Sequence, residues 1–193
     1  MNKQPKVTEK TRRSFVEAFC QLYLEKPIDK ISIRDITTLA GYNRSTFYLY
    51  FSDIYTLRTF VEDDLLDYVQ VNLSKDDPKL KTEQGMLSKL LFLFEHKENE
   101  LKAVLGPYGN LNFIGRLKKI IVSTSTISDN FVPEVPADDK YFAYFLECNV
   151  SIALNLFQLW LKRGKDLSKE ELVSLSYQLY KFGVQGTKRD KQE

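Results

Sequence analysis

Residues 32–51 read Ser-Ile-Arg-Asp-Ile-Thr-Thr-Leu-Ala-Gly-Tyr-Asn-Arg-Ser-Thr-Phe-Tyr-Leu-Tyr-Phe, and this stretch decides the fold. Ser32, followed three residues later by Asp35, has the form of a capping box at the start of a helix. Gly41 stands where a residue in the left-handed conformation ends a helix. Asn43 can then cap a second short helix. Two short capped helices joined by a tight turn that contains glycine predict a helix-turn-helix.

The second helix of this pair, predicted over residues 44–50, has the composition of a helix that reads DNA. Phe47 and Phe51 are four residues apart and are predicted to face the core. The outward side chains comprise a guanidinium, hydroxyls and phenols but no acid, and such groups bond to base edges and to phosphates. The predicted DNA-binding residues are Ser32, Tyr42, Asn43, Arg44, Ser45, Thr46, Tyr48 and Tyr50.

The apolar residues on both sides of this stretch recur at helical spacing. A helix through Phe15 and Phe19 precedes it and is stopped by Pro27. No alternating strand pattern is convincing, so the chain is predicted to be all-α. We expect a three-helix helix-turn-helix DNA-binding domain in residues 1–60 and a helical-bundle dimerisation and regulatory domain in residues 61–193. Further helices are predicted at about 54–73, 79–94, 113–121, 138–162 and 168–182, with a turn at 106–109 and a loop at 123–137.

The composition is that of an ordinary globular protein, with 43% hydrophobic and 28% charged residues among 193. The net charge is only +2, but residues 1–60 carry +4 and the rest −2, which is a weak indication of an anionic partner. The N-terminus is polar, and polar residues interrupt the most apolar stretch, 141–161. We therefore expect a cytoplasmic protein without a membrane partner. Cys20 and Cys148 lie in apolar helical patterns and are predicted to be reduced thiols in the core.

Residues 32–51 resemble the N-terminal domain of the TetR/AcrR family of transcriptional regulators, and the resemblance extends over about residues 8–60. It includes Ala40-Gly41, Thr46-Phe47-Tyr48 and Phe51. The resemblance implies that Thr46 and Tyr48 anchor backbone phosphates, and that Arg44 and Ser45 read bases.

Two features depart from the family pattern. Tyr42 replaces a small valine in the turn, where it could add a contact to DNA. Residues 52–54, Ser-Asp-Ile, replace a segment in which the family carries lysines that touch phosphate. The basic residues that could compensate are Lys3, Lys6, Lys10 and Arg12.

For the second domain, the resemblance implies a small-molecule pocket and a dimer interface built from the last two long helices. The apolar surface of the penultimate helix is too wide to bury against a single neighbour, which independently favours an interface, with a core role as the alternative. The predicted interface residues are Ile152, Leu156, Leu159, Trp160, Leu172, Leu175 and Leu179. A pocket for an unidentified small-molecule effector, with a filled core as the alternative, is predicted from Phe92, Phe113, Tyr141, Phe145 and Asn149.

Taken together, these features predict a regulator that represses transcription by binding a palindromic operator in double-stranded DNA as a homodimer. An enzyme is disfavoured because the sequence has no phosphate-binding glycine loop and no metal-ligand spacing. Its single histidine, His96, lies in a charged tract, so we predict no catalytic residue, no metal and no cofactor. The alternative is a helical protein-interaction adaptor with a vestigial helix-turn-helix, since the lysines expected near Asp53 are missing.

Overall fold

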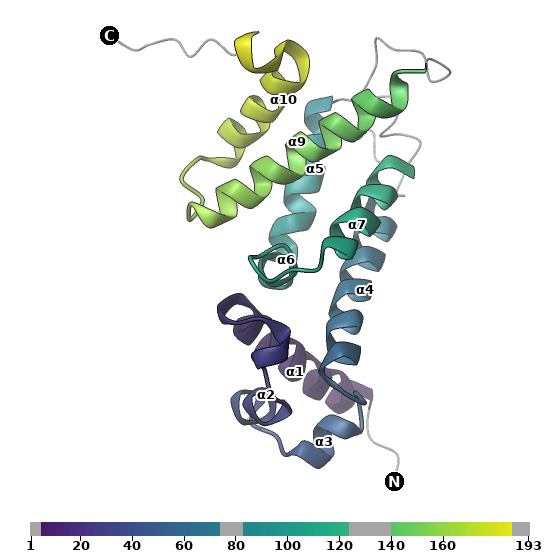
Figure 1. Ribbon diagram of the computed structural model, residues 1–193, viewed down its shortest axis with the longest axis vertical. Helices are drawn as coiled ribbons and strands as arrows, with labels where there is room; N and C mark the ends of the chain where they lie inside the picture. Colours follow the sequence, from purple (N-terminus) through teal and green to yellow (C-terminus); the bar gives the residue numbers. More distant parts are fainter. Residues whose placement is uncertain (1–4, 74–82, 124–139, 187–193) are drawn as a thin grey trace. The chain divides into compact units, whose positions relative to one another are not determined.

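The computed structural model describes residues 5–73, 83–123 and 140–186 (Figure 1). These residues form helices and turns without a strand, which confirms the all-α prediction. The chain divides into two compact units, which are described separately below. The first unit comprises residues 1–68 and 97–114, and the second comprises residues 69–96 and 115–193. The predicted DNA-binding domain, residues 1–60, lies wholly within the first unit.

The first unit gathers the three helices of the helix-turn-helix domain and the beginning of a long fourth helix (Figure 1). It also contains a short helix and a turn that come later in the chain. Its elements are α1 (Pro5–Glu25), the 3-10 turn η1 (Ile28–Lys30), α2 (Ile33–Ala40), α3 (Arg44–Tyr48), most of α4 (Ile54–Leu73), α6 (Glu98–Val104) and the start of α7 (Leu111–Ser123).

A cluster of aromatic rings from α1, from the turn after α2 and from α3 forms the core of this domain. Phe15 of α1 and Phe47 of α3 are completely buried, and their rings meet edge to face with centroids 5.4 Å apart. Tyr42 and Tyr50 cover the same ring of Phe15, at 5.3 and 6.1 Å. Phe51 is buried beside Phe47, so both phenylalanines face the core as predicted. This packing fixes the orientation of α3 relative to α1.

The predicted ends of α2 and the predicted start of α3 are confirmed. The Ser32 hydroxyl accepts the Asp35 amide hydrogen, and the Asp35 carboxylate accepts that of Ser32, both at 3.1 Å. Gly41 ends α2 with φ +74°, and the Asn43 side chain caps α3. Helix α3 ends at Tyr48 rather than at residue 50, because the chain tightens there into bonds between residues three apart, with Tyr50 N donating to the Phe47 carbonyl at 2.9 Å.

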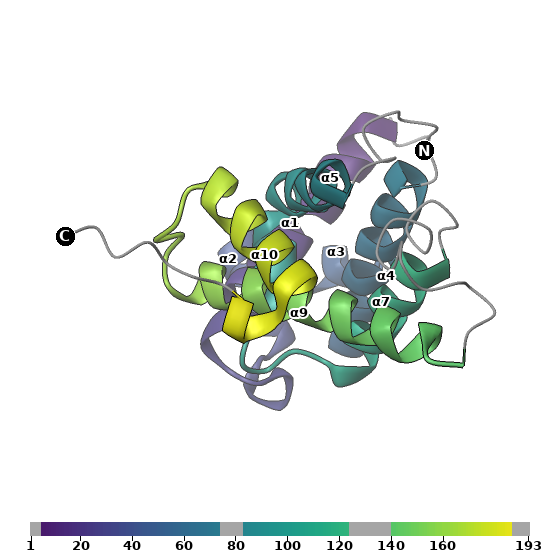
Figure 2. The same cartoon turned by 90° about the horizontal axis from the view of Figure 1, so that it is seen from above.

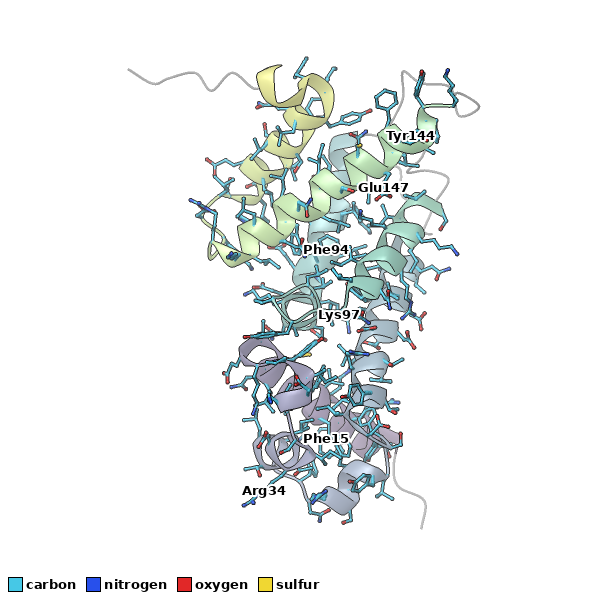
Figure 3. The ribbon with its side chains drawn as sticks, viewed as in Figure 1. Phe15, Arg34, Phe94, Lys97, Tyr144 and Glu147 are labelled. Atoms are coloured by element: carbon cyan, nitrogen blue, oxygen red, sulfur yellow. The ribbon has the colours of Figure 1, made fainter. Side chains whose placement is uncertain are left out.

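Helix α6 was not predicted from the sequence. It packs on α1 and buries Leu101, Ala103 and Val104. Its N-terminal Lys97 bonds to Asp64 of α4 at 2.8 Å (Figure 3), and Asp64 also accepts from Arg13 of α1 at 3.3 Å. These contacts make α6 part of the first unit.

The turn after α6 is held to the same unit by buried polar groups. Tyr23 of α1 donates its phenol hydrogen to the Tyr108 carbonyl at 2.5 Å. Glu62 of α4 is buried and accepts from the Asn110 amide at 3.3 Å. It also pairs with Arg58, one helical turn earlier, at 3.5 Å. A buried carboxylate requires such partners, so Asn110 and Arg58 stabilise the charge of Glu62.

The second unit contains α5 (Glu83–His96), the rest of α7, α9 (Phe142–Lys162) and α10 (Lys169–Gly186). Helix α10 packs against both α5 and α9 (Figure 2). Gly164 (φ +72°) lies in the turn after α9, and the capping box from Ser168 to Glu171 is present at 2.7 and 3.1 Å. The loop predicted at 123–137 lies outside the described residues, apart from Ser123.

Three residues of this unit lie in surroundings that differ from those predicted. Trp160 and Leu172 were predicted at the dimer interface, but they are only 3% and 5% exposed. The Trp160 indole donates to the Leu167 carbonyl at 2.8 Å, because the chain folds back over it after α9. Both residues therefore belong to the core. Cys148 was predicted in the core but lies exposed on α9, whereas Cys20 is buried as predicted, and both thiols are free.

Candidate nucleic-acid interface

The outer surface of α2, the turn and α3 carries the predicted DNA-binding residues. Arg44, Ser45 and Tyr48 are exposed, with half of the Tyr48 surface accessible. Tyr42 and Tyr50 are half-buried because their rings pack on Phe15. The turn tyrosine therefore contributes chiefly to the aromatic core. Of the other predicted residues, Ser32 and Asn43 are exposed, and Thr46 is half-buried.

The Asn43 side chain organises the first turn of α3. Its Oδ1 atom accepts the Thr46 backbone amide hydrogen at 2.8 Å. The Ser45 hydroxyl also lies 2.7 Å from this oxygen, and the Thr46 hydroxyl 2.8 Å. The two hydroxyls expected to meet DNA are therefore already bonded to the same carbonyl oxygen.

Two arginines supply positive charge on this surface. Arg44 donates to the Tyr48 phenol oxygen at 3.5 Å, one helical turn further along. Arg34 of α2 is exposed and points away from the helices (Figure 3), and its side chain has no partner among the described residues. Arg34 was not among the predicted DNA-binding residues, although its position two residues after the Ser32 cap could have indicated it.

The acid within α2 is compensated. Lys26 bonds to the Asp35 carboxylate at 3.0 Å. The hydrogen bond from Lys26, followed by that from the Ser32 amide, holds the pKa of Asp35 below its usual value. Asp35 therefore stays ionised and paired, and it adds little repulsion toward an anionic partner.

At the start of α4, where the family carries lysines, Ser52 and Asp53 form hydrogen bonds to Thr56 instead. Asp53 accepts the Thr56 amide hydrogen at 2.7 Å and caps the helix, and Ser52 lies 2.8 Å from the Thr56 hydroxyl. The hydrogen bonds from the Thr56 amide and hydroxyl lower the pKa of Asp53, which stays ionised. The segment thus serves the helix end instead of offering a cation.

The basic residues expected to compensate for these lysines differ in their surroundings. Lys10 is exposed on α1. Arg12 pairs with Glu9, and its guanidinium lies 5.1 Å above the Phe60 ring. Arg12 is therefore already engaged within the first unit. Lys3 and the Lys6 side chain lie outside the described part of the chain.

The residues predicted to line a pocket are divided between the two units. Phe113 is completely buried in the first unit. Phe92 is half-exposed on α5, and Tyr141 and Phe145 are half-exposed on α9. None of these residues lines the cavity described next, so one pocket formed by them and Asn149 stays a prediction.

One cavity lies between α5, α7, α9 and α10. Its volume is about 30 Å³, and its one polar lining residue, Ser176, donates its hydroxyl hydrogen to the Leu172 carbonyl at 2.8 Å. A space of this size holds one or two water-sized groups. Its apolar lining includes Leu91, Phe94, Ile121, Val150 and Phe157.

Comparison with known proteins finds a similar protein among the solved structures. No family model and no curated protein matches the sequence. Among solved structures, the crystal structure of a TetR transcriptional regulator from Streptococcus agalactiae superimposes with a TM-score of 0.64. The alignment covers 91% of this chain and 96% of that one, at 20% identity. The chain has the TetR fold.

Within the second unit of this TetR fold, the outer face of α9 is apolar and exposed, except that Ile152 and Leu156 are half-buried. We call it the α9 stripe, and its most exposed residue is Tyr144, at 72% (Figure 3). Helix α9 is long and apolar enough to span a membrane, and only 22% of its most apolar window is buried within the chain. From the sequence we expected the polar residues in this stretch to prevent it from spanning a membrane. By length and composition alone the helix could span one, and one such helix is weak evidence for a membrane. The stripe consists of Tyr141, Tyr144, Phe145, Cys148, Ile152, Leu156 and Leu159.

Proposed function

We propose that this protein is a DNA-binding transcriptional regulator of the TetR family, which represses transcription by occupying a palindromic operator as a homodimer. The observation that carries the proposal is the exposed surface of α2 and α3. This surface bears Arg34, Arg44 and Tyr48, while Asp35 is neutralised by Lys26. Such a surface matches the polyanionic face of a duplex.

The geometry suggests how the surface binds. Helix α3 enters the major groove with its first turn toward the base edges. Arg44 bonds to guanine, since a guanidinium pairs in bidentate fashion with O6 and N7 of that base. The Tyr48 phenol oxygen accepts from Arg44 and keeps its own hydrogen for a phosphate. Arg34 contacts the backbone beside the groove.

A second copy of the chain is the proposed partner of the α9 stripe. Readers of palindromic sites carry two recognition helices about one duplex turn apart, roughly 34 Å. The stripe offers a continuous apolar face of the kind that homodimers bury. Of the predicted interface residues, Ile152, Leu156 and Leu159 lie on the stripe, and Leu175 and Leu179 of α10 are half-buried.

An effector would act through the second unit. A small molecule that enlarges the cavity between α5, α7, α9 and α10 would favour a different dimer geometry. In that geometry the two DNA-binding domains would no longer fit successive major grooves. An effector that binds in this cavity must first enlarge it, because 30 Å³ is far below the volume of ordinary ligand sites.

Duplexes selected from a randomised pool by the full-length protein provide the test. Their affinity should fall steeply as salt rises. Arg44→Ala should cost about 1–3 kcal/mol of specific binding, and Arg34→Ala should lower the salt slope by about one. The matched control is Arg163→Ala, which removes the same charge from an exposed residue paired with Asp166 in the second unit. An adaptor with a vestigial helix-turn-helix would select no duplex, and that result would refute the proposal.

A further inference from the structure

The hydrogen bonds of Asn43 decide what Ser45 can offer to a base. Three donors surround Asn43 Oδ1, namely the Thr46 amide and the hydroxyls of Ser45 and Thr46, at 2.7–2.8 Å. The Thr46 amide can only donate, so the side-chain atom that it meets must be the oxygen of Asn43 and not its NH2 group. This fixes the orientation of the Asn43 amide.

Asn43 Oδ1 has three donors around it but only two lone pairs. A carbonyl oxygen has two lone pairs, and the Thr46 amide always occupies one of them. One hydroxyl can hold the other fully, so binding to DNA can release the second hydroxyl at little cost. The resemblance to the TetR/AcrR family implies that Thr46 anchors a phosphate, which only accepts hydrogen bonds. Thr46 must therefore turn its hydrogen outward, and Ser45 keeps its hydrogen on Asn43.

We propose that Ser45 is a specificity-determining residue that accepts a hydrogen bond from the exocyclic amino group of adenine or cytosine. With its hydrogen held by Asn43, the exposed Ser45 hydroxyl presents only lone pairs to the groove. In the major groove, the N6 amino group of adenine and the N4 amino group of cytosine are the available donors. Guanine and thymine present acceptors there, so Ser45 disfavours them. This inference rests on the proposed DNA-binding function.

The neighbouring Arg44 has the opposite polarity. A guanidinium only donates, so Arg44 selects the acceptors of guanine, whereas Ser45 selects a donor. Two adjacent residues of one helical turn thus impose complementary demands on neighbouring base positions. Without Asn43, the Ser45 hydroxyl could both donate and accept hydrogen bonds, so it would not distinguish one base from another.

Selection from a randomised duplex pool tests the role of Ser45. The wild-type protein should enrich adenine or cytosine at one position of each half-site. Ser45→Ala should lose the preference at that position only and bind the selected duplex about three- to tenfold more weakly, the value of one hydrogen bond. Asn43→Gly keeps a serviceable helix cap but frees the Ser45 hydroxyl, so guanine and thymine should become acceptable at that position.

A modified duplex separates contact from general weakening. Removing the exocyclic amino group from the selected base should weaken wild-type binding to the same extent and leave Ser45→Ala unaffected. Unchanged preferences in Ser45→Ala, or a strict preference in Asn43→Gly, would overturn the role of Ser45 while DNA binding stands. Failure of the wild-type protein to enrich any duplex would overturn the proposed function together with this inference.

Discussion

Gly41 is the residue on which the joint between α2 and α3 depends. It adopts φ +74°, and the following amide of Tyr42 closes the turn onto the Thr37 carbonyl at 3.0 Å. A Cβ at Gly41 would meet no atom within 4 Å, so the cost of a side chain is confined to the backbone conformation. Gly41→Ala should lower the free energy of unfolding by about 1–2 kcal/mol, measured by urea denaturation.

Gly115 is the matched control for that substitution. It lies within α7, where a Cβ also meets no atom within 4 Å and φ is not positive. Gly115→Ala should raise the free energy of unfolding, by up to about 1 kcal/mol, because alanine is the better helix former. Equal effects of the two substitutions would contradict the role given to the left-handed turn.

Among the elements, those defined by local chemistry could be predicted, and those defined by packing could not. The caps at Ser32 and Asn43 depend on neighbours within three residues, and the sequence shows them directly. Helix α6 has seven residues and no side-chain cap, so it leaves too short a pattern to recognise. Trp160 is buried by a fold-back of the chain that periodicity does not reveal. For the same reason, Leu172 was predicted at the interface although it is buried, whereas the caps of α2 and α3 were predicted correctly.

Helix α6 should be held less firmly at acid pH. Burial raises the pKa of Asp64, but the hydrogen bond and charge of Lys97 and the charge of Arg13 outweigh it, so the net pKa is lowered. Folding therefore favours the ionised carboxylate. This stabilisation is complete above the unfolded-state pKa of about 3.9 and is lost as the pH falls through the lower folded-state value.

Asp64→Asn tests this dependence on pH. The wild-type protein should be more stable than the variant at pH 7, and the difference should shrink as the pH falls below about 4. Urea denaturation at several pH values gives the difference directly. A difference that stays constant from pH 7 to pH 2 would show that the ion pairs with Lys97 and Arg13 do not hold α6.

At the scale of the whole molecule, assembly and DNA binding should be lost together. Tyr144 and Glu147 lie within one turn of α9 (Figure 3) but have different surroundings. Glu147 pairs with Lys118 of α7 at 2.6 Å, whereas Tyr144 is exposed on the α9 stripe. Tyr144→Glu removes no core contact, so the variant should fold. A charge on the stripe should nevertheless prevent pairing, since burying an unpaired carboxylate is costly.

We therefore expect Tyr144→Glu to sediment as a monomer where the wild-type protein sediments as a dimer. Its affinity for a palindromic duplex should fall to that of the wild-type protein for a single half-site, because a single DNA-binding domain then binds alone. Val71→Glu places the same charge on an exposed apolar residue outside the stripe and should remain dimeric. A dimeric Tyr144→Glu protein, or a wild-type monomer that binds a palindrome no better than a half-site, would contradict the α9 stripe as the dimer interface.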